Sequence, residues 1–185
     1  MEQRGHPFAG SSQSPDAWRG DLDVPRFEPG ETEYLLWLGC ATRYDERAQA
    51  VTRALVRILG RAGVSFGVLE RSRCTGDPAK QIGNELLFAE LAGQNVDELN
   101  GLGVHKLITT CAHCFNAFTR YYPELGGSWE VVPHAVLIDR LLAEGKLAIP
   151  DAEREAITFH DPCYLSRHND VEDEARSVLG RVGRV

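Results

Sequence analysis

Short apolar runs and longer amphipathic stretches alternate along most of this chain. Four runs have the length and aliphatic content of buried strands, at residues 34–38, 64–69, 104–110 and 130–132. Apolar residues recur at helical spacing over residues 44–62, 77–99 and 135–143, and a further helix follows the third run and ends before Pro123. This alternation predicts an α/β fold with a mainly parallel, Rossmann-like sheet.

The helix expected over residues 77–99 has clear start signals. Asp77 can act as its N-cap and Pro78 as its first helical residue. Ile82, Leu86, Leu87 and Leu91 fit the helical period, and we expect the leucines of the helices to lie in the core.

The chain divides into three segments by pattern. Residues 1–30 are rich in Gly, Ser, Pro and Gln without periodicity, which predicts a flexible or surface-wrapping lead-in. Residues 31–150 hold the alternating strands and helices. Residues 151–185 begin a new unit, because 155–159 has the pattern of an opening strand and ends at His160-Asp-Pro-Cys163. We therefore expect one α/β subdomain and the start of a second, pseudo-symmetric repeat.

Composition excludes several classes of partner. The net charge is −7 and no dense run of Lys and Arg occurs, so we expect no nucleic-acid surface. The apolar runs are far too short for a membrane span, and the N-terminus lacks the pattern of a secretory signal. We therefore expect a cytoplasmic protein, with attachment to the inner face of the cell membrane through partners as an option.

Four cysteines follow the ends of predicted strands. Cys40 follows the first strand, Cys74 the second, and Cys111 and Cys114 the third. Loops at the carboxyl ends of parallel strands meet at one edge of a sheet, so these thiols should converge. Four thiolates suit an iron–sulfur cluster or Zn²⁺. The alternatives are a Cys-x-x-Cys dithiol enzyme and buried cysteines that act as small apolar side chains.

The spacing and surroundings of these cysteines resemble the cysteine-rich CCG domain. Cys40 is followed by 33 residues, Cys74-Thr-Gly76, 34 residues and Cys111-x-x-Cys114. That domain occurs in the B-type subunit of heterodisulfide reductase and in iron–sulfur oxidoreductases of glycolate, lactate and glycerol-phosphate metabolism. The branch that pairs with electron-transfer flavoprotein is similar in the segments Gly39–Asp45, Cys74–Pro78, Gly83–Glu85, Thr110–Phe115 and His160–Leu165. The resemblance covers residues 34 to 179.

The resemblance implies a CCG-type domain over residues 31–150 and an incomplete second CCG-type repeat over 151–185. Its expected ligands for a [4Fe–4S] cluster are Cys40, Cys74, Cys111 and Cys114. The chain would pass electrons from electron-transfer flavoprotein, or from another flavoprotein subunit, toward further clusters or quinone. A further iron–sulfur subunit or a missing C-terminal half would complete it, so the chain alone should not turn over as an enzyme. The alternative is a structural zinc module that docks the subunits of a redox complex.

Departures from the family pattern refine these expectations. Thr75 stands where many members have a second adjacent cysteine, which favours a four-ligand cubane or zinc over a five-cysteine non-cubane cluster. Cys163 resembles the first ligand of a second site, or it is a free thiol. Around the ligands, Thr75 could donate to a sulfur and Gly76 could allow close backbone approach. His113 and His160 are candidate proton-carrying or orienting side chains, with an ordinary surface or strand-end role as the alternative.

Overall fold

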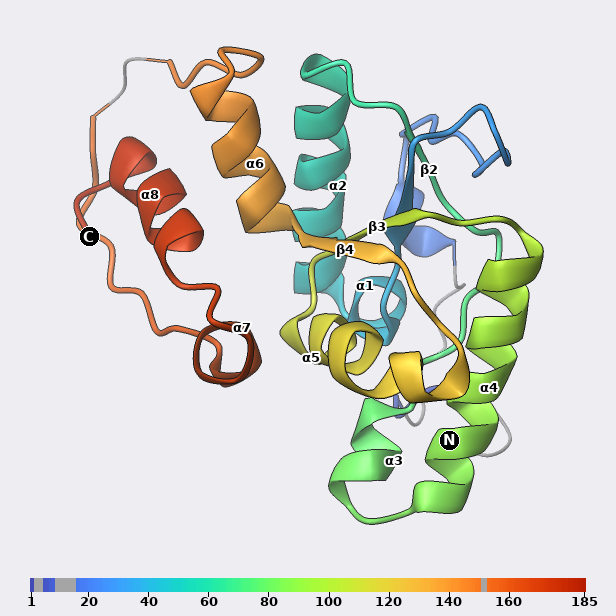
Figure 1. Ribbon diagram of the computed structural model, residues 1–185. Helices are drawn as coiled ribbons and strands as arrows, with labels where there is room; N and C mark the ends of the chain where they lie inside the picture. The colour runs from blue at the N-terminus through green and yellow to red at the C-terminus, as the bar shows by residue number, and fades with distance from the viewer. Residues whose placement is uncertain (2–4, 9–15, 151–152) are drawn as a thin grey trace.

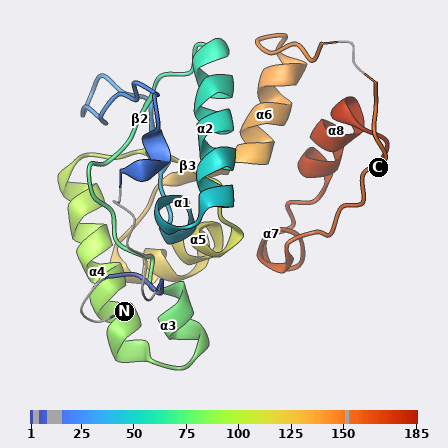
Figure 2. The same cartoon turned by 180° about the vertical axis from the view of Figure 1, so that it is seen from behind.

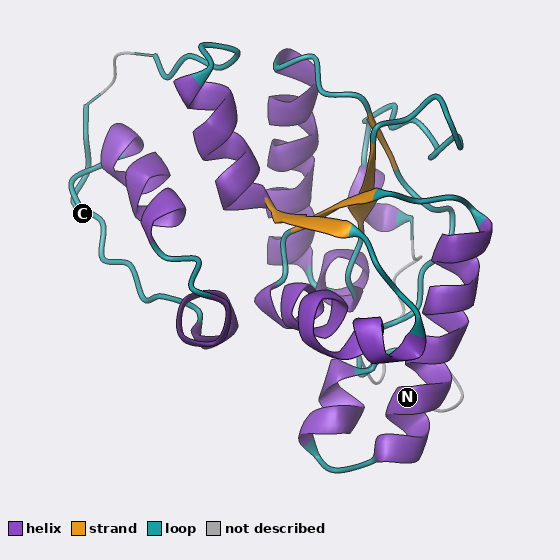
Figure 3. Cartoon of the chain, viewed as in Figure 1, coloured by secondary structure: helices purple, strands orange, loops and turns teal. Residues whose placement is uncertain are grey.

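A computed structural model of the protein describes residues 1, 5–8, 16–150 and 153–185. Its sheet contains four parallel strands in the order β2-β1-β3-β4 (Figure 3). The strands are β1 (Tyr34–Trp37), β2 (Phe66–Gly67), β3 (Lys106–Thr109) and β4 (Glu130–Pro133). Each lies within a predicted run or extends it by one residue, so the α/β, Rossmann-like prediction is confirmed.

The described helices connect and follow these strands (Figure 1). The α-helices are α1 (Cys40–Tyr44), α2 (Glu46–Arg61), α3 (Asp77–Gln81), α4 (Glu85–Gly101), α5 (Ala112–Asn116), α6 (His134–Ala143), α7 (Cys163–Asn169) and α8 (Asp173–Val182). Short 3-10 helices are η1 (Ala17–Arg19) and η3 (Tyr122–Leu125), and η2 (Ala117–Tyr121) is a π-helical turn.

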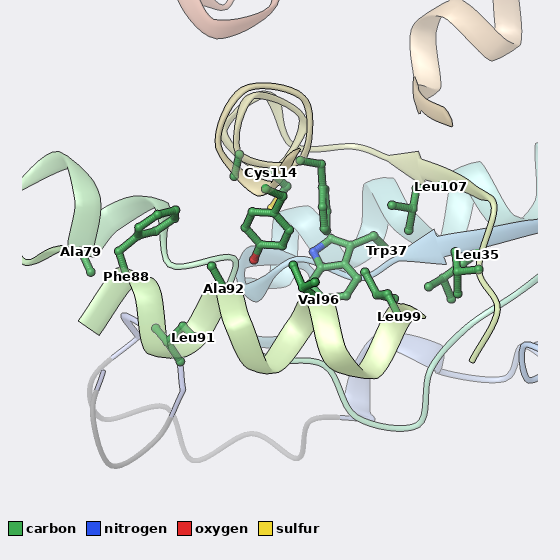
Figure 4. Packing of buried hydrophobic residues seen from close by; sticks show 14 of the residues in the cluster. Leu35, Trp37, Ala79, Phe88, Leu91, Ala92, Val96, Leu99, Leu107 and Cys114 are labelled. Atoms are coloured by element: carbon green, nitrogen blue, oxygen red, sulfur yellow. The ribbon is translucent and has the colours of Figure 1, made fainter. Parts of the chain in front are cut away.

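Side chains that alternate along the strands pack into two hydrophobic clusters, one on each face of the sheet. Leu35 and Trp37 face a cluster built with α4 and the α5–η3 segment, whereas Tyr34 and Leu36 face a cluster built with α2 and α6. In the first cluster, Val96 and Leu99 of α4 face Trp37 and the sheet (Figure 4). Each fully buried side chain of this size contributes roughly 1.5–3 kcal/mol of transfer free energy. The sheet is therefore covered on both faces, which is typical of parallel sheets.

The C-terminal segment packs beside this sandwich and not within the sheet. Helix α8 contacts α6, and α7 contacts α5 (Figures 1 and 2). The strand predicted over 155–159 is wrong. Ala156 makes only an isolated bridge to Arg184, and the amide of Ile157 donates to the carbonyl of Arg184 at 2.8 Å. The backbone of this segment is paired locally, through hydrogen bonds that join Glu155 and Ile157 to Arg184.

The helix predicted over 77–99 is also corrected, because it breaks between α3 and α4. Gly83 has a φ of 79° there, and the Asn84 side chain accepts a hydrogen bond from the Leu87 amide as the N-cap of α4. The break leaves Ile82, just before it, and Leu86, in the first turn of α4, on the exposed side of the chain. Ile82 and Leu86 are consequently 80% and 83% exposed, which contradicts the expectation that Leu86 is core.

Part of the lead-in contributes to the core. Trp18 and Val24 are buried in the α2–α6 cluster, and Arg26 forms a parallel bridge with Val68. Residues 2–4 and 9–15 of the expected lead-in lie outside the described residues. Among the described residues, no helix is both long enough and apolar enough to cross a membrane.

Candidate metal centre

The strand order places the four cysteines at the switch point of the sheet. The chain passes from β1 to β2 on one side, and β3 and β4 lie on the other side of β1. The crevice beyond the carboxyl ends of β1 and β3 is where such sheets bind ligands. Cys40 begins α1 after β1, and Cys111 and Cys114 follow β3. Cys74 arrives from the loop between β2 and α3, so three loops contribute to one place.

The four thiols form two hydrogen-bonded pairs, Cys40 with Cys74 and Cys111 with Cys114. In the first pair, the hydrogen bond to Cys74 and burial raise the pKa of Cys40, and the hydrogen bond from Cys40 lowers the pKa of Cys74. In the second pair, the hydrogen bond from Cys114 lowers the pKa of Cys111 to about 6, and the pKa of Cys114 is raised well above its ordinary value by the hydrogen bond to Cys111 and by burial. Each pair thus presents one sulfur as an electron-rich acceptor.

Backbone amides point at three of the four sulfurs. The N–H of Ala41 donates to Cys40, the N–H of Gly76 donates to Cys74, and the N–H groups of His113 and Cys114 donate to Cys111. Each bond lowers the pKa of the thiol that receives it. N–H groups arranged around sulfur stabilise thiolates and tune the potential of any metal that these thiolates bind.

Two glycines shape the backbone beside the thiols, Gly39 at a sulfur and Gly76 in the turn after Cys74. A Cβ atom at Gly39 would lie 3.3 Å from Cys114 Sγ. Gly76 has a φ of 80°, and a Cβ atom there would lie 3.1 Å from a ring carbon of Phe88. The turn from Cys74 into α3 therefore needs glycine for its conformation and for its packing.

Thr75 lies inside the cluster of thiols. It is buried, and its hydroxyl Oγ1 is 3.9 Å from Cys114 Sγ. The side chain that stands in place of a family cysteine is thus directed at one of the four sulfurs, where a hydroxyl can donate a hydrogen bond.

Asp77 and His113 join the two cysteine loops. His113 Nδ1 lies 2.7 Å from Asp77 Oδ2, and the Asp77 side chain is 1% exposed whereas that of His113 is 57% exposed. The prediction that Asp77 caps the helix is wrong, since Gly76 is the N-cap and the Asp77 carboxylate bonds to His113 and Gln81 instead. The Asp77 carboxylate therefore binds His113, which is distant in sequence, instead of a backbone amide of its own helix. The His113 ring also meets the Tyr164 ring edge-on at 4.6 Å.

Cys163 and His160 are exposed and lie in the C-terminal segment. Among the described residues, the hydrogen bonds of the four thiols include neither of them. Cys163 begins α7 much as Cys40 begins α1, and each short helix precedes a longer one. This order of elements is compatible with a second repeat that opens at Cys163, which stays a prediction.

Sequence reasoning missed two buried polar residues behind the Cys74 turn. Asn95 and Tyr122 are each 0% exposed. Asn95 Nδ2 donates to the Cys74 carbonyl at 3.1 Å and to the Tyr122 hydroxyl at 3.0 Å, and that hydroxyl donates to the Thr75 carbonyl at 3.0 Å. The position of Asn95 could have been recognised from the sequence, because it falls on the apolar face of α4 between Leu91 and Leu99. A polar side chain buried there requires a hydrogen-bond partner.

Four thiols are a donor set for Zn²⁺ and for iron–sulfur clusters alike. Zinc–thiolate bonds of about 2.3 Å would draw four sulfurs into a tetrahedron with edges of roughly 4 Å. Within the described part of the chain, no group of three or more His, Cys, Asp or Glu side chains is arranged to hold one metal ion. A [4Fe–4S] cluster takes the same set of four cysteine thiolates, one on each iron.

Known proteins are similar to this chain in sequence. The protein of Syntrophomonas wolfei named EtfAB:quinone oxidoreductase is 44% identical over 154 residues, which are 83% of this chain and 22% of that protein. The probable iron-sulfur-binding oxidoreductase FadF of Bacillus subtilis is 36% identical over 188 residues, covering 97% of this chain and 27% of that protein.

One component of a methanogen enzyme is also similar. This component of the dihydromethanophenazine:CoB--CoM heterodisulfide reductase from Methanosarcina mazei is 32% identical over 159 residues, covering 82% of this chain and 38% of its own length. The chain thus spans between 22% and 38% of the length of these three relatives. No solved structure gives a significant match. Residues 34–119 match the cysteine-rich CCG domain.

Proposed function

We propose that this chain is an electron-transfer module that binds an iron–sulfur cluster through Cys40, Cys74, Cys111 and Cys114. The observation that carries the proposal is the convergence of four thiols from three loops, with backbone N–H groups directed at their sulfurs. The names of the relatives, a probable iron-sulfur-binding oxidoreductase among them, support the same cofactor.

A [4Fe–4S] cluster fits the residues present. The chain supplies four thiols and has Thr75 where a fifth family ligand would stand. When bound, such a cluster accepts and releases single electrons. The protein holds the sulfurs, donates hydrogen bonds to them, and keeps water from the buried Cys74 and Cys114. Because the pKa values of Cys40 and Cys114 are raised, the protein alone does not stabilise four thiolates, and the positive charge of the iron would be needed.

Electrons would enter at the more open edge of the site. Cys40 and Cys111 are partly exposed, whereas Cys74 and Cys114 are buried. A mostly apolar groove of about 360 Å³, lined by Ala41, Val51 and Thr110 among others, opens beside these two partly exposed cysteines. A partner that docks there would bring its own redox centre close to the cluster.

The partner and acceptor follow from the family. We propose a flavoprotein of the electron-transfer type as donor and further clusters or quinone as acceptors, as the name EtfAB:quinone oxidoreductase suggests for one relative. Further iron–sulfur subunits or segments would extend the path, and a position at the inner face of the cell membrane would be reached through them. We include in this proposal a second CCG-type repeat that begins in the C-terminal segment with Cys163.

The decisive experiment is anaerobic purification with iron, sulfide and zinc analysis and an EPR spectrum of the reduced protein. We expect about four iron and four sulfide per chain, brown colour that bleaches on reduction, and a one-electron [4Fe–4S] signal. Stoichiometric zinc in a colourless protein would instead support the structural zinc module.

A dithiol enzyme is the second candidate, because Cys111 has a pKa of about 6 and its partner Cys114 is buried. This candidate predicts disulfide reductase activity in the metal-free protein. Cys111→Ser should abolish that activity, and Cys40→Ser should leave it intact. Metal-free protein without such activity excludes this candidate.

A further inference from the structure

Two hydrogen bonds fix the peptides around which the Cys74 turn is built. The Tyr122 hydroxyl donates to the carbonyl of Thr75 at 3.0 Å, and Asn95 Nδ2 donates to the carbonyl of Cys74 at 3.1 Å. In a trans peptide the C=O and the following N–H point in opposite directions. A carbonyl held toward Asn95 or Tyr122 therefore directs the N–H of the next residue away from that side chain.

One of these amides reaches a sulfur. The peptide whose carbonyl binds Tyr122 carries the N–H of Gly76, and this N–H donates to the thiol of Cys74. The connection runs from the Tyr122 hydroxyl through one rigid peptide to a sulfur. Asn95 strengthens the arrangement, because it donates to the Tyr122 hydroxyl at 3.0 Å and orients the hydroxyl hydrogen toward Thr75.

The hydroxyl of Tyr122 has a role separate from its ring. The ring packs against Phe118 at 4.9 Å and Trp129 at 6.2 Å between centroids, which accounts for its place in the core. A phenylalanine would satisfy that packing. The buried hydroxyl and the buried Asn95 amide are polar groups that the core does not require, so their hydrogen bonds to the turn call for another explanation.

We propose that Asn95 and Tyr122 are positioning residues that hold the Cys74–Gly76 turn with the Gly76 N–H facing the Cys74 sulfur and so raise the reduction potential of the cluster. The inference rests on the proposed function, because it assigns a role toward the cluster that Cys74 would bind. N–H···S hydrogen bonds stabilise the more negative, reduced state of a cluster, and losing one lowers its potential.

The test uses the whole chain, reconstituted anaerobically with iron and sulfide, and EPR-monitored redox titration. Tyr122→Phe should retain the iron content of the wild type and show a lower midpoint potential. Tyr121→Phe is the matched control, because it removes a hydroxyl from the neighbouring residue, whose ring packs on Phe88 at 5.8 Å. Equal potentials and equal iron contents in the wild type and Tyr122→Phe would overturn the proposal.

A second measurement does not need the cluster. In metal-free, reduced protein, the Gly76 amide of Tyr122→Phe should exchange with solvent about fivefold faster than in the wild type, which corresponds to roughly 1 kcal/mol for one lost hydrogen bond. Unchanged exchange at Gly76 overturns the positioning role. If the wild type binds no iron, the proposed function fails, and this exchange measurement still decides the role of Tyr122.

If Tyr122→Phe does not fold, 3-fluorotyrosine at position 122 keeps the test decisive. Fluorine makes the hydroxyl a stronger donor and scarcely changes the ring, so the midpoint potential should rise. An unchanged potential in that variant would contradict the inference.

Discussion

The Cys74 turn should respond to a single methyl group at Gly76. Gly76→Ala places a Cβ atom 3.1 Å from Phe88 Cδ2 and 3.3 Å from the Phe88 carbonyl oxygen, at a φ of 80°. The left-handed conformation costs a non-glycine residue roughly 1–2 kcal/mol. Overpacking against a buried ring and a helix backbone adds about 1–3 kcal/mol. The free energy of unfolding should therefore fall by roughly 2–5 kcal/mol in total.

Gly83→Ala is the matched control. Gly83 has a φ of 79°, and nothing lies within 4 Å of a Cβ atom built there. This variant incurs only the conformational cost of about 1–2 kcal/mol. The difference between the two variants isolates the contact with Phe88.

Urea unfolding of the metal-free protein under reducing conditions, followed by far-UV circular dichroism, measures both values. The same two proteins are then reconstituted, and their iron content is compared. Gly76→Ala should lose iron because its turn moves, and Gly83→Ala should not. Equal unfolding free energies in the two variants would refute the argument that Phe88 closes this turn.

Further predictions concern the ligands and one buried histidine. Replacement by serine of any one of four cysteines should abolish iron binding, as measured by a colorimetric iron assay. These cysteines are Cys40, Cys74, Cys111 and Cys114. Cys163→Ser should keep the full iron content, and a loss of iron in this variant would contradict the four-cysteine assignment. Thr75→Cys should alter the EPR spectrum by offering a fifth sulfur, whereas a five-cysteine spectrum in the wild type would refute the role given to Thr75. Burial lowers the pKa of His134, so the unfolded chain gains a proton as pH falls through about 6.5 and the folded chain resists it. Stability should therefore decline below that pH, and His134→Gln should flatten the decline in urea titrations at pH values from about 5 to 7.

Hydrophobic periodicity predicted the elements that are buried on one or both sides. The strand with Leu35 and Leu36 is apolar throughout because helices cover both faces of the sheet. The same periodicity failed at Leu86, which fits the helical pattern yet is 83% exposed. Periodicity assumes one continuous axis, and the turn at Gly83 starts a new axis for α4.

The convergence of the cysteines was predictable from topology, because parallel strands bring their following loops to one edge. The side chains that hold the cysteine loops in place were not predictable from the sequence. Asp77 has a suitable local role as a helix cap, and only the folded chain reveals that its partner is His113, on a loop that follows another strand. Asn95 and Tyr122 likewise act on a turn about 20 to 50 residues away in sequence, a range over which no local pattern operates.

The same kind of long-range contact fastens the C-terminal segment to the cysteine domain. Asn169, at the end of α7, donates to Asn116 Oδ1 at 3.0 Å and accepts from Arg120 Nε at 3.0 Å. Arg120 also donates to the carbonyl of His168 at 2.6 Å. These polar contacts hold α7 against the helix that carries Cys114. Because Cys163 begins α7, these contacts fix its position relative to the helix that carries Cys114, and a second site built on it would lie at a set distance from the first.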